Sequence, residues 1–208
     1  MDASVRAMGT WFVSFVSPQL AGCRLGRSVS EAREISVVPA SPDEAALLER
    51  LLELYLHDLS ETFPIDVDLT GRFGYEALPL YWEEPDRRFP FLIRRDGRAV
   101  GFALVTRGSP ATDDPSDLDV AEFFVLRRHR YQGTGRAAAI QLWDRMPGHW
   151  VVRVSNGNVP ALPFWRAAVR DYTGGAFEER RLPGKVHDWT VFVFTSGRPN
   201  PKADPGLR

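Results

Sequence analysis

The chain has 208 residues, of which 44% are hydrophobic and 25% charged, with a formal net charge of −1. This length allows one well-buried core but is short for two full domains, and a balanced charge excludes the general affinity for nucleic acid that needs a surplus of Lys and Arg. Cys23 is the only cysteine, and no run of 18 apolar residues indicates a membrane-spanning helix, so we expect a cytoplasmic protein without a membrane partner.

The two ends of the chain differ from its middle. Residues 20–23 spell Leu-Ala-Gly-Cys, which resembles a bacterial lipoprotein cleavage box, but Ser14, Ser17 and Pro18 interrupt the apolar run before it. We therefore expect residues 1–33 to be a flexible extension. Residues 197–208, with three prolines among polar residues, are an expected disordered tail, which leaves residues 34–196 as one domain.

The first third of that domain predicts a strand followed by helices. Residues 34–39 form the strand, and a capping-box signature that starts at Ser41 begins the first helix. Apolar residues at three-and-four spacing then predict an amphipathic helix with its apolar stripe in the core. The stripe contains Leu48, Leu51, Leu52, Tyr55 and Leu59. Residues 75–82 predict a short second helix, interrupted near Pro79.

Strands and helices alternate through the rest of the domain. Asp96-Gly97 is a turn signal, so residues 89–94 and 99–106 predict an antiparallel hairpin, and residues 117–126 predict the next strand. The later segments are a helix at 134–146, a strand at 150–155, a helix at 159–171, and strands at 177–181 and 189–195.

A glycine-containing loop joins the strand at 117–126 to the following helix. Its sequence is Arg130-Tyr131-Gln132-Gly133-Thr134-Gly135-Arg136. Two glycines permit a tight turn, so successive N–H groups can converge on one anion at the positive end of the helix. The loop therefore predicts a pyrophosphate site.

Two other phosphate loops fit this segment less well. The chain contains no Walker sequence Gly-x-x-x-x-Gly-Lys-Ser/Thr. Gly133, Gly135 and Ala138 formally satisfy the Rossmann pattern, but about 20 residues later, where that motif needs an acidic ribose ligand, residues 153–155 are Arg-Val-Ser. A nucleotide-dependent oxidoreductase is thus a lower-ranked alternative.

The pattern Arg-x-x-Gly-x-Gly between a strand and a helix resembles the acetyl-CoA loop of the GNAT superfamily of N-acetyltransferases. The order of elements over residues 34–196 is similar to that of the family, and residues 158–165 resemble its segment Asn-x-x-Ala-x-x-x-Tyr, with Trp165 in place of the tyrosine. The resemblance implies an α/β (α+β) fold, with a mixed, mostly antiparallel central sheet of about seven strands flanked by about four helices.

The resemblance also implies a coenzyme site. Acetyl-CoA would be the cosubstrate, no metal would be needed, and Asn158 would hold the pantetheine arm. The splayed strands, one ending near Leu126 and the other beginning near Trp150, would expose backbone groups to that arm. The implied contacts are Phe124, Val125, Leu126, Arg130, Tyr131, Gln132, Gly133, Thr134, Gly135, Arg136, Asn158 and Trp165.

Glu122 is the predicted catalytic base. Strand alternation places it on one face with Val120, Phe124 and Leu126, where apolar neighbours would raise its pKa, and its position matches a functional acid of the family. The structural alternatives are an inward carboxylate paired with an arginine, or a glutamate exposed where the strands separate.

The general acid is less well defined, because an indole at position 165 cannot donate its proton to a thiolate. Tyr172, two helical turns further on, is the predicted acid, with Tyr131 and solvent as alternatives.

These features predict direct transfer of an acetyl group, within a ternary complex, to the primary amine of a small molecule or peptide. The alternative function, a non-catalytic acyl-CoA-binding or sensing module, stays open because Trp165 replaces the tyrosine of the family. The acceptor is undetermined, and a homodimer formed through the edge of the last strand pair is also left open.

Overall fold

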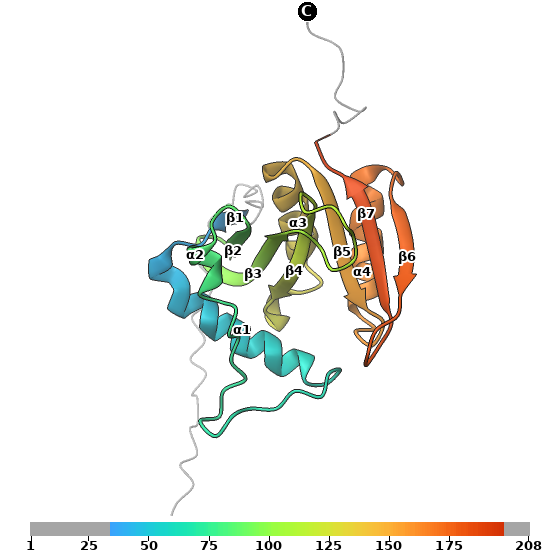
Figure 1. Ribbon diagram of the computed structural model, residues 1–208. Helices are drawn as coiled ribbons and strands as arrows, with labels where there is room; N and C mark the ends of the chain where they lie inside the picture. Colours follow the sequence, from blue (N-terminus) through green and yellow to red (C-terminus); the bar gives the residue numbers. More distant parts are fainter. Residues whose placement is uncertain (1–33, 198–208) are drawn as a thin grey trace, which may run out of the picture. The chain divides into compact units, whose positions relative to one another are not determined.

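The computed structural model describes residues 34–197 (Figure 1). The expected extension at residues 1–33, and the expected tail apart from Gly197, lie outside the described residues. The strands are β1 (Ile35–Pro39), β2 (Arg88–Arg95), β3 (Arg98–Arg107), β4 (Leu118–Val125), β5 (His149–Ser155), β6 (Glu178–Leu182) and β7 (Trp189–Thr195). The α-helices are α1 (Ala45–Leu59), α2 (Leu80–Glu83), α3 (Thr134–Arg145) and α4 (Ala161–Thr173), with short 3-10 turns at Pro42–Glu44 and Arg127–His129.

The strands form one sheet in the order β1-β2-β3-β4-β5-β7-β6. Every neighbouring pair is antiparallel except β4 and β5, which run parallel. The predicted mixed, mostly antiparallel sheet of seven strands with four helices is confirmed. The edge strand β6 begins Glu-Glu-Arg-Arg, and charged side chains on an edge disfavour pairing with a second copy.

Both predicted helix starts in the first third need adjustment. The capping box at Ser41 is present, with its N–H donating to Glu44 Oε2 at 3.0 Å, but a 3-10 turn precedes α1. The helix predicted over residues 75–82 is only Leu80–Glu83. Proline disfavours helical backbone in the residue before it, so this helix begins after Pro79.

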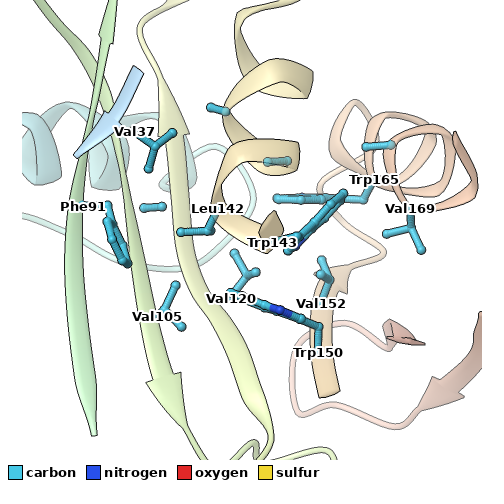
Figure 2. Close-up of a cluster of buried hydrophobic side chains, with 14 of the residues drawn as sticks. Val37, Phe91, Val105, Val120, Leu142, Trp143, Trp150, Val152, Trp165 and Val169 are labelled. Atoms are coloured by element: carbon cyan, nitrogen blue, oxygen red, sulfur yellow. The ribbon is translucent and has the colours of Figure 1, made fainter. Parts of the chain in front are cut away.

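Helices cover both faces of the sheet. α3 and α4 lie on one face and α1 crosses the other (Figure 1). The larger core cluster lies beneath α3 and α4, where Leu142 and Trp143 of α3 meet Val152 of β5 (Figure 2). Between residues 34 and 197, no helix is long and apolar enough to span a bilayer.

A β-bulge in β4 changes which way its side chains face. Leu104 of β3 lies opposite Glu122 and the next residue, Val105, lies opposite Val120, so Ala121 is an extra residue. Because one extra residue reverses the alternation, Val120 packs beneath α3 and α4, whereas Phe124 packs on the α1 side. The prediction that Glu122 shares a face with Val120 is therefore wrong. The prediction that Glu122 shares a face with Phe124 and Leu126 is right.

Truncation of a core leucine should measure how much the α3 packing contributes. Leu142 is 1% exposed, so Leu142→Ala should lower the free energy of unfolding by about 3 kcal/mol through lost apolar contacts and a cavity. Leu54→Ala, at a leucine of α1 that is 50% exposed, should change it by less than about 0.5 kcal/mol. Denaturant titration of both variants checks this, and equal losses would contradict the assigned burial.

Candidate active site

A cavity of about 200 Å³ lies where β4 and β5 separate. Only Leu118–Val120 of β4 pair with β5, and their partners are Trp150–Val152. Beyond these residues the two strands diverge, as the resemblance implies. The lining comes from both faces of the sheet: Tyr55, Leu59 and Phe63 from the α1 side, Ala161 and Trp165 from α4, Trp189 from β7, the strand residues 120–123 and 152–155, and Asn158. Two molecules entering from opposite faces could therefore meet in this gap.

Glu122 lies in this cavity with both carboxylate oxygens occupied. Tyr55 Oη donates to Oε2, and Tyr75 Oη donates to Oε1 at 3.1 Å. Burial raises the pKa of Glu122, while the two tyrosine hydrogen bonds oppose that rise. The outcome is a carboxyl group with a raised pKa, as an amine base near neutral pH requires.

The two tyrosines that contact Glu122 keep their own protons. Burial, reinforced by the negative charge of Glu122, raises the pKa of Tyr55 well above its ordinary value and also raises that of Tyr75. Tyr55 was expected only in the apolar stripe of the first helix, and Tyr75 was not among the expected site residues. A partly buried phenol usually needs a hydrogen-bond partner, and this need was the signal in the sequence that could have indicated a polar role for both tyrosines.

Arg153 is the cation that lines the cavity, and Asp119 neutralises it. Its Nε and Nη2 atoms donate to the two Asp119 oxygens at 2.8 and 3.0 Å, and the Asp119 side chain is 0% exposed. The guanidinium lies over the ring of Trp189, 5.8 Å from its centroid. Arg153 is thus paired with Asp119, and no described arginine forms an ion pair with Glu122. The structural alternative of a Glu122–arginine pair is therefore not seen.

The glycine loop presents an open row of backbone donors. Gly133 has a left-handed φ of 78° and precedes α3, and Tyr131 has a φ of 58° with its side chain 96% exposed. From residue 131 to residue 136, no backbone N–H group donates to an acceptor in the described part of the chain. This is the geometry that binds an anion at a helix N-terminus.

The two arginines predicted to add charge to this loop already have protein partners. Arg130 donates to Asp58 Oδ2 at 2.6 Å and to the Val125 carbonyl at 2.7 Å. Arg136 forms an exposed ion pair with Asp171 at 3.0 Å. Each arginine therefore reaches the loop with its charge partly neutralised.

Arg95 of β2 was missed by the sequence analysis. It is only 8% exposed, and its Nη1 atom donates to Gln132 Oε1 at 2.7 Å and to Thr134 Oγ1 at 3.4 Å. Among the ion pairs of the described residues, none involves Arg95. A buried guanidinium beside the positive end of α3, bonded only to neutral groups, favours a nearby anion.

The other predicted site residues divide into two groups. Asn158 and Trp165 line the cavity. Phe124 and Val125 at the end of β4, and Leu126 just after it, lie outside the cavity lining, and the Leu126 N–H donates to the Val100 carbonyl. Residues 34–197 contain no group of three or more His, Cys, Asp or Glu side chains arranged to hold a metal ion.

Tyr172 does not line the cavity. Its hydroxyl donates to Asp144 Oδ1 at 2.8 Å, and its ring packs 4.9 Å from that of Trp143. Burial raises its pKa to about 12. The structure thus does not bring Tyr172 together with Glu122.

A mixed sheet that opens beside a glycine loop, with a carboxyl group in the gap, defines the acetyltransferase class of this fold. The model of the acetyltransferase (GNAT) family matches residues 48–168, and the chain belongs to that family.

Solved structures share this fold. An acetyltransferase from Thermus thermophilus has a TM-score of 0.55 and 20% identity, covering 77% of this chain and 96% of that one. A protein from Salmonella typhimurium, solved with its cofactor acetyl-CoA, has a TM-score of 0.56 and 15% identity, covering 82% and 99%. An aminoglycoside acetyltransferase in complex with coenzyme A has a TM-score of 0.57 and 15% identity, covering 78% and 95%. A search of curated protein sequences finds no match.

The Asp119 carboxylate should be essential for stability. Asp119→Asn leaves the Arg153 guanidinium without its counter-charge and should lower the free energy of unfolding by about 3 kcal/mol. Asp171→Asn breaks an ion pair in which both side chains are about half exposed and should change it by less than about 1 kcal/mol. Denaturant unfolding compares the two variants, and a small loss in the first would show that Arg153 is well solvated.

Proposed function

We propose that the protein is a cytoplasmic N-acetyltransferase that moves the acetyl group of acetyl-CoA directly to a primary amine in a ternary complex. One observation carries the proposal: the gap between β4 and β5 is lined from both faces of the sheet and holds a carboxyl group of raised pKa. Family membership and the open N–H groups of the glycine loop support it.

In this proposal the coenzyme lies along the end of β4 and the start of α3. The N–H groups of Tyr131, Gln132, Gly133, Thr134 and Gly135 bind the pyrophosphate, and Arg130 and Arg136 add charge at either side. The arm passes the backbone of Phe124, Val125 and Leu126 and reaches Asn158 and Trp165. Burial of Arg95 next to Gln132 supports a further charge contribution from below the loop.

The chemistry requires one base in this scheme. Glu122 accepts a proton from the ammonium group, and the freed nitrogen lone pair attacks the thioester carbonyl carbon. The tetrahedral intermediate loses a second N–H proton to solvent and collapses, the C–S bond breaks, and coenzyme A leaves as a thiolate. Tyr55 is the phenol that lines the cavity, and its hydroxyl is engaged in a hydrogen bond to Glu122, so we assign protonation of the thiolate to solvent.

The dependence of rate on pH tests the base. Because Glu122 must be ionised and its pKa is raised, kcat/KM should rise as pH increases through that pKa. Glu122→Gln should lower kcat/KM by about 100-fold and remove this rising limb. Tyr55→Phe removes a hydrogen bond that favours the carboxylate, so the limb should move to higher pH.

These profiles are measured by release of the coenzyme A thiol, with acetyl-CoA saturating and the amine concentration varied. An unchanged profile in Glu122→Gln would refute its role as base. Tyr172→Phe separates the two proton sources, because a large loss of kcat in that variant would favour Tyr172 over solvent.

Thermal stability tests the coenzyme site. Acetyl-CoA at about 100 times its dissociation constant should stabilise the protein by about 2.7 kcal/mol, and NAD(P)H should not. Gly133→Glu should abolish this shift, because it places a carboxylate among the anion-binding N–H groups. Gly174→Glu is the matched control, since Gly174 also has a left-handed φ, 64°, but ends α4. Loss of the shift in both variants would point to backbone strain instead.

The proposed contribution of Arg95 to pyrophosphate binding is tested by comparing acetyl-CoA with a ligand that lacks the pyrophosphate. Arg95→Met should weaken binding of acetyl-CoA about tenfold, because it removes a buried positive charge beside the anion. The same variant should bind S-acetylpantetheine as tightly as the natural protein does. Calorimetry with both ligands checks this, and an equal loss for both would mean that Arg95 only maintains the loop.

A further inference from the structure

The α1 side of the cavity has an aromatic wall. Phe63 continues the helical turn after α1, with its N–H donating to the Leu59 carbonyl at 2.9 Å. Its ring stacks on that of Trp189, with centroids 6.2 Å apart and planes inclined by 29°. Leu59 and Tyr55 line the same side at the preceding helical turns. A flat apolar group would be well matched to this wall.

The cavity offers one uncompensated charge. Glu122 is the carboxylate among the described lining residues, and the positive charge of Arg153 is cancelled by Asp119. A single ammonium group can pair with Glu122. A second ammonium on the same molecule would lose its hydration against Phe63 and Trp189 without meeting a second carboxylate, which is unfavourable.

The loop between β6 and β7 packs against the aromatic wall next to the cavity. A ring nitrogen of His187 lies 3.0 Å from the Thr62 carbonyl, and the His187 ring meets Phe63 edge-on at 5.8 Å. On its other side, His187 packs so tightly against Gly157 that a Cβ there would come within 2.5 Å of the ring. These contacts join three loop segments beside Phe63, so little room is left next to the wall for an acceptor as bulky as an extended polypeptide. At about 200 Å³ the space is also below the range of about 300–1,000 Å³ usual for drug-sized ligands.

We infer that the acceptor is a small primary monoamine whose body is an aromatic ring, and that polyamines, aminoglycosides and polypeptides are poor acceptors. This inference rests on the proposed function. The ammonium group pairs with Glu122, and the ring lies against Phe63 and Trp189. The nitrogen loses one proton to Glu122, attacks the acetyl carbon, and loses a second proton to solvent as the amide forms. The C–S bond breaks, and the departing thiolate takes a proton from solvent.

The test compares acceptors on the full chain. Phenethylamine, spermidine, kanamycin and a peptide with a free N-terminus are each supplied with acetyl-CoA, and both thiol release and the mass of the product are followed. We expect kcat/KM for phenethylamine to exceed that of each other amine by at least about tenfold.

Two variants show whether the wall and the charge set this preference. Phe63→Leu keeps an apolar side chain but removes the ring, so KM for phenethylamine should rise about tenfold while KM for acetyl-CoA stays constant. Phe177→Leu is the matched control, because that ring packs on Phe192 beneath α4, outside the cavity lining. Leu59→Glu adds a second carboxylate to the cavity and should raise the ratio of spermidine to phenethylamine turnover about tenfold.

The outcomes separate this inference from the proposed function. The inference of an aromatic monoamine acceptor is overturned if the protein binds acetyl-CoA but prefers spermidine, kanamycin or the peptide. It is also overturned if the protein binds acetyl-CoA but acetylates none of the four amines. An unchanged KM for phenethylamine in Phe63→Leu overturns the assigned wall. Failure to bind acetyl-CoA at all overturns the proposed function itself.

Discussion

The incomplete pairing of β4 with β5 is the constraint on which the site depends. Parallel strands joined over only three residues on each side leave the rest of both inner edges without strand partners. The bulge at Ala121 reverses the side-chain alternation of β4 at the point where the two strands separate, and turns Glu122 toward α1. Unpaired backbone groups in a protein interior need water or a ligand as partners. An amide-rich arm lying in the gap would supply them, as an additional strand would.

The electrostatics of the gap follow from this geometry. Glu122 and Asp119 come from the same short segment of β4, yet they have opposite environments. Asp119 is fully buried and forms a bidentate ion pair, whereas Glu122 is bonded only to neutral hydroxyls. The Asp119 carboxylate, fully paired with Arg153, has a structural role. Burial raises the pKa of Glu122, whose hydrogen-bond donors are neutral, and this is the environment that the proposed base requires.

Much of the fold could be predicted from the sequence, because hydrophobic periodicity and turn residues are local signals. The hairpin at Asp96-Gly97 and the loop at Gly133 are examples. The bulge could not be predicted, since only the pairing of β4 with β3 fixes the register in which Ala121 is the extra residue. Tyr75 and Arg95 were also missed as site residues, because each acts across a distance of 37 residues or more in the chain. Tyr55 was assigned to the correct helix face, but its hydroxyl partner depends on tertiary packing.

The tryptophan at position 165 links packing to chemistry. Its ring is 7% exposed and lies 5.0 Å from the rings of both Phe123 and Phe164 and 6.3 Å from that of Trp143. These aromatic neighbours accommodate an indole in a place where a phenol would need a polar partner. An indole cannot protonate a leaving thiolate, and a coenzyme A thiolate is stable enough at neutral pH to depart without help. An indole at this position is thus compatible with the proposed transfer, in which one carboxylate acts on the amine.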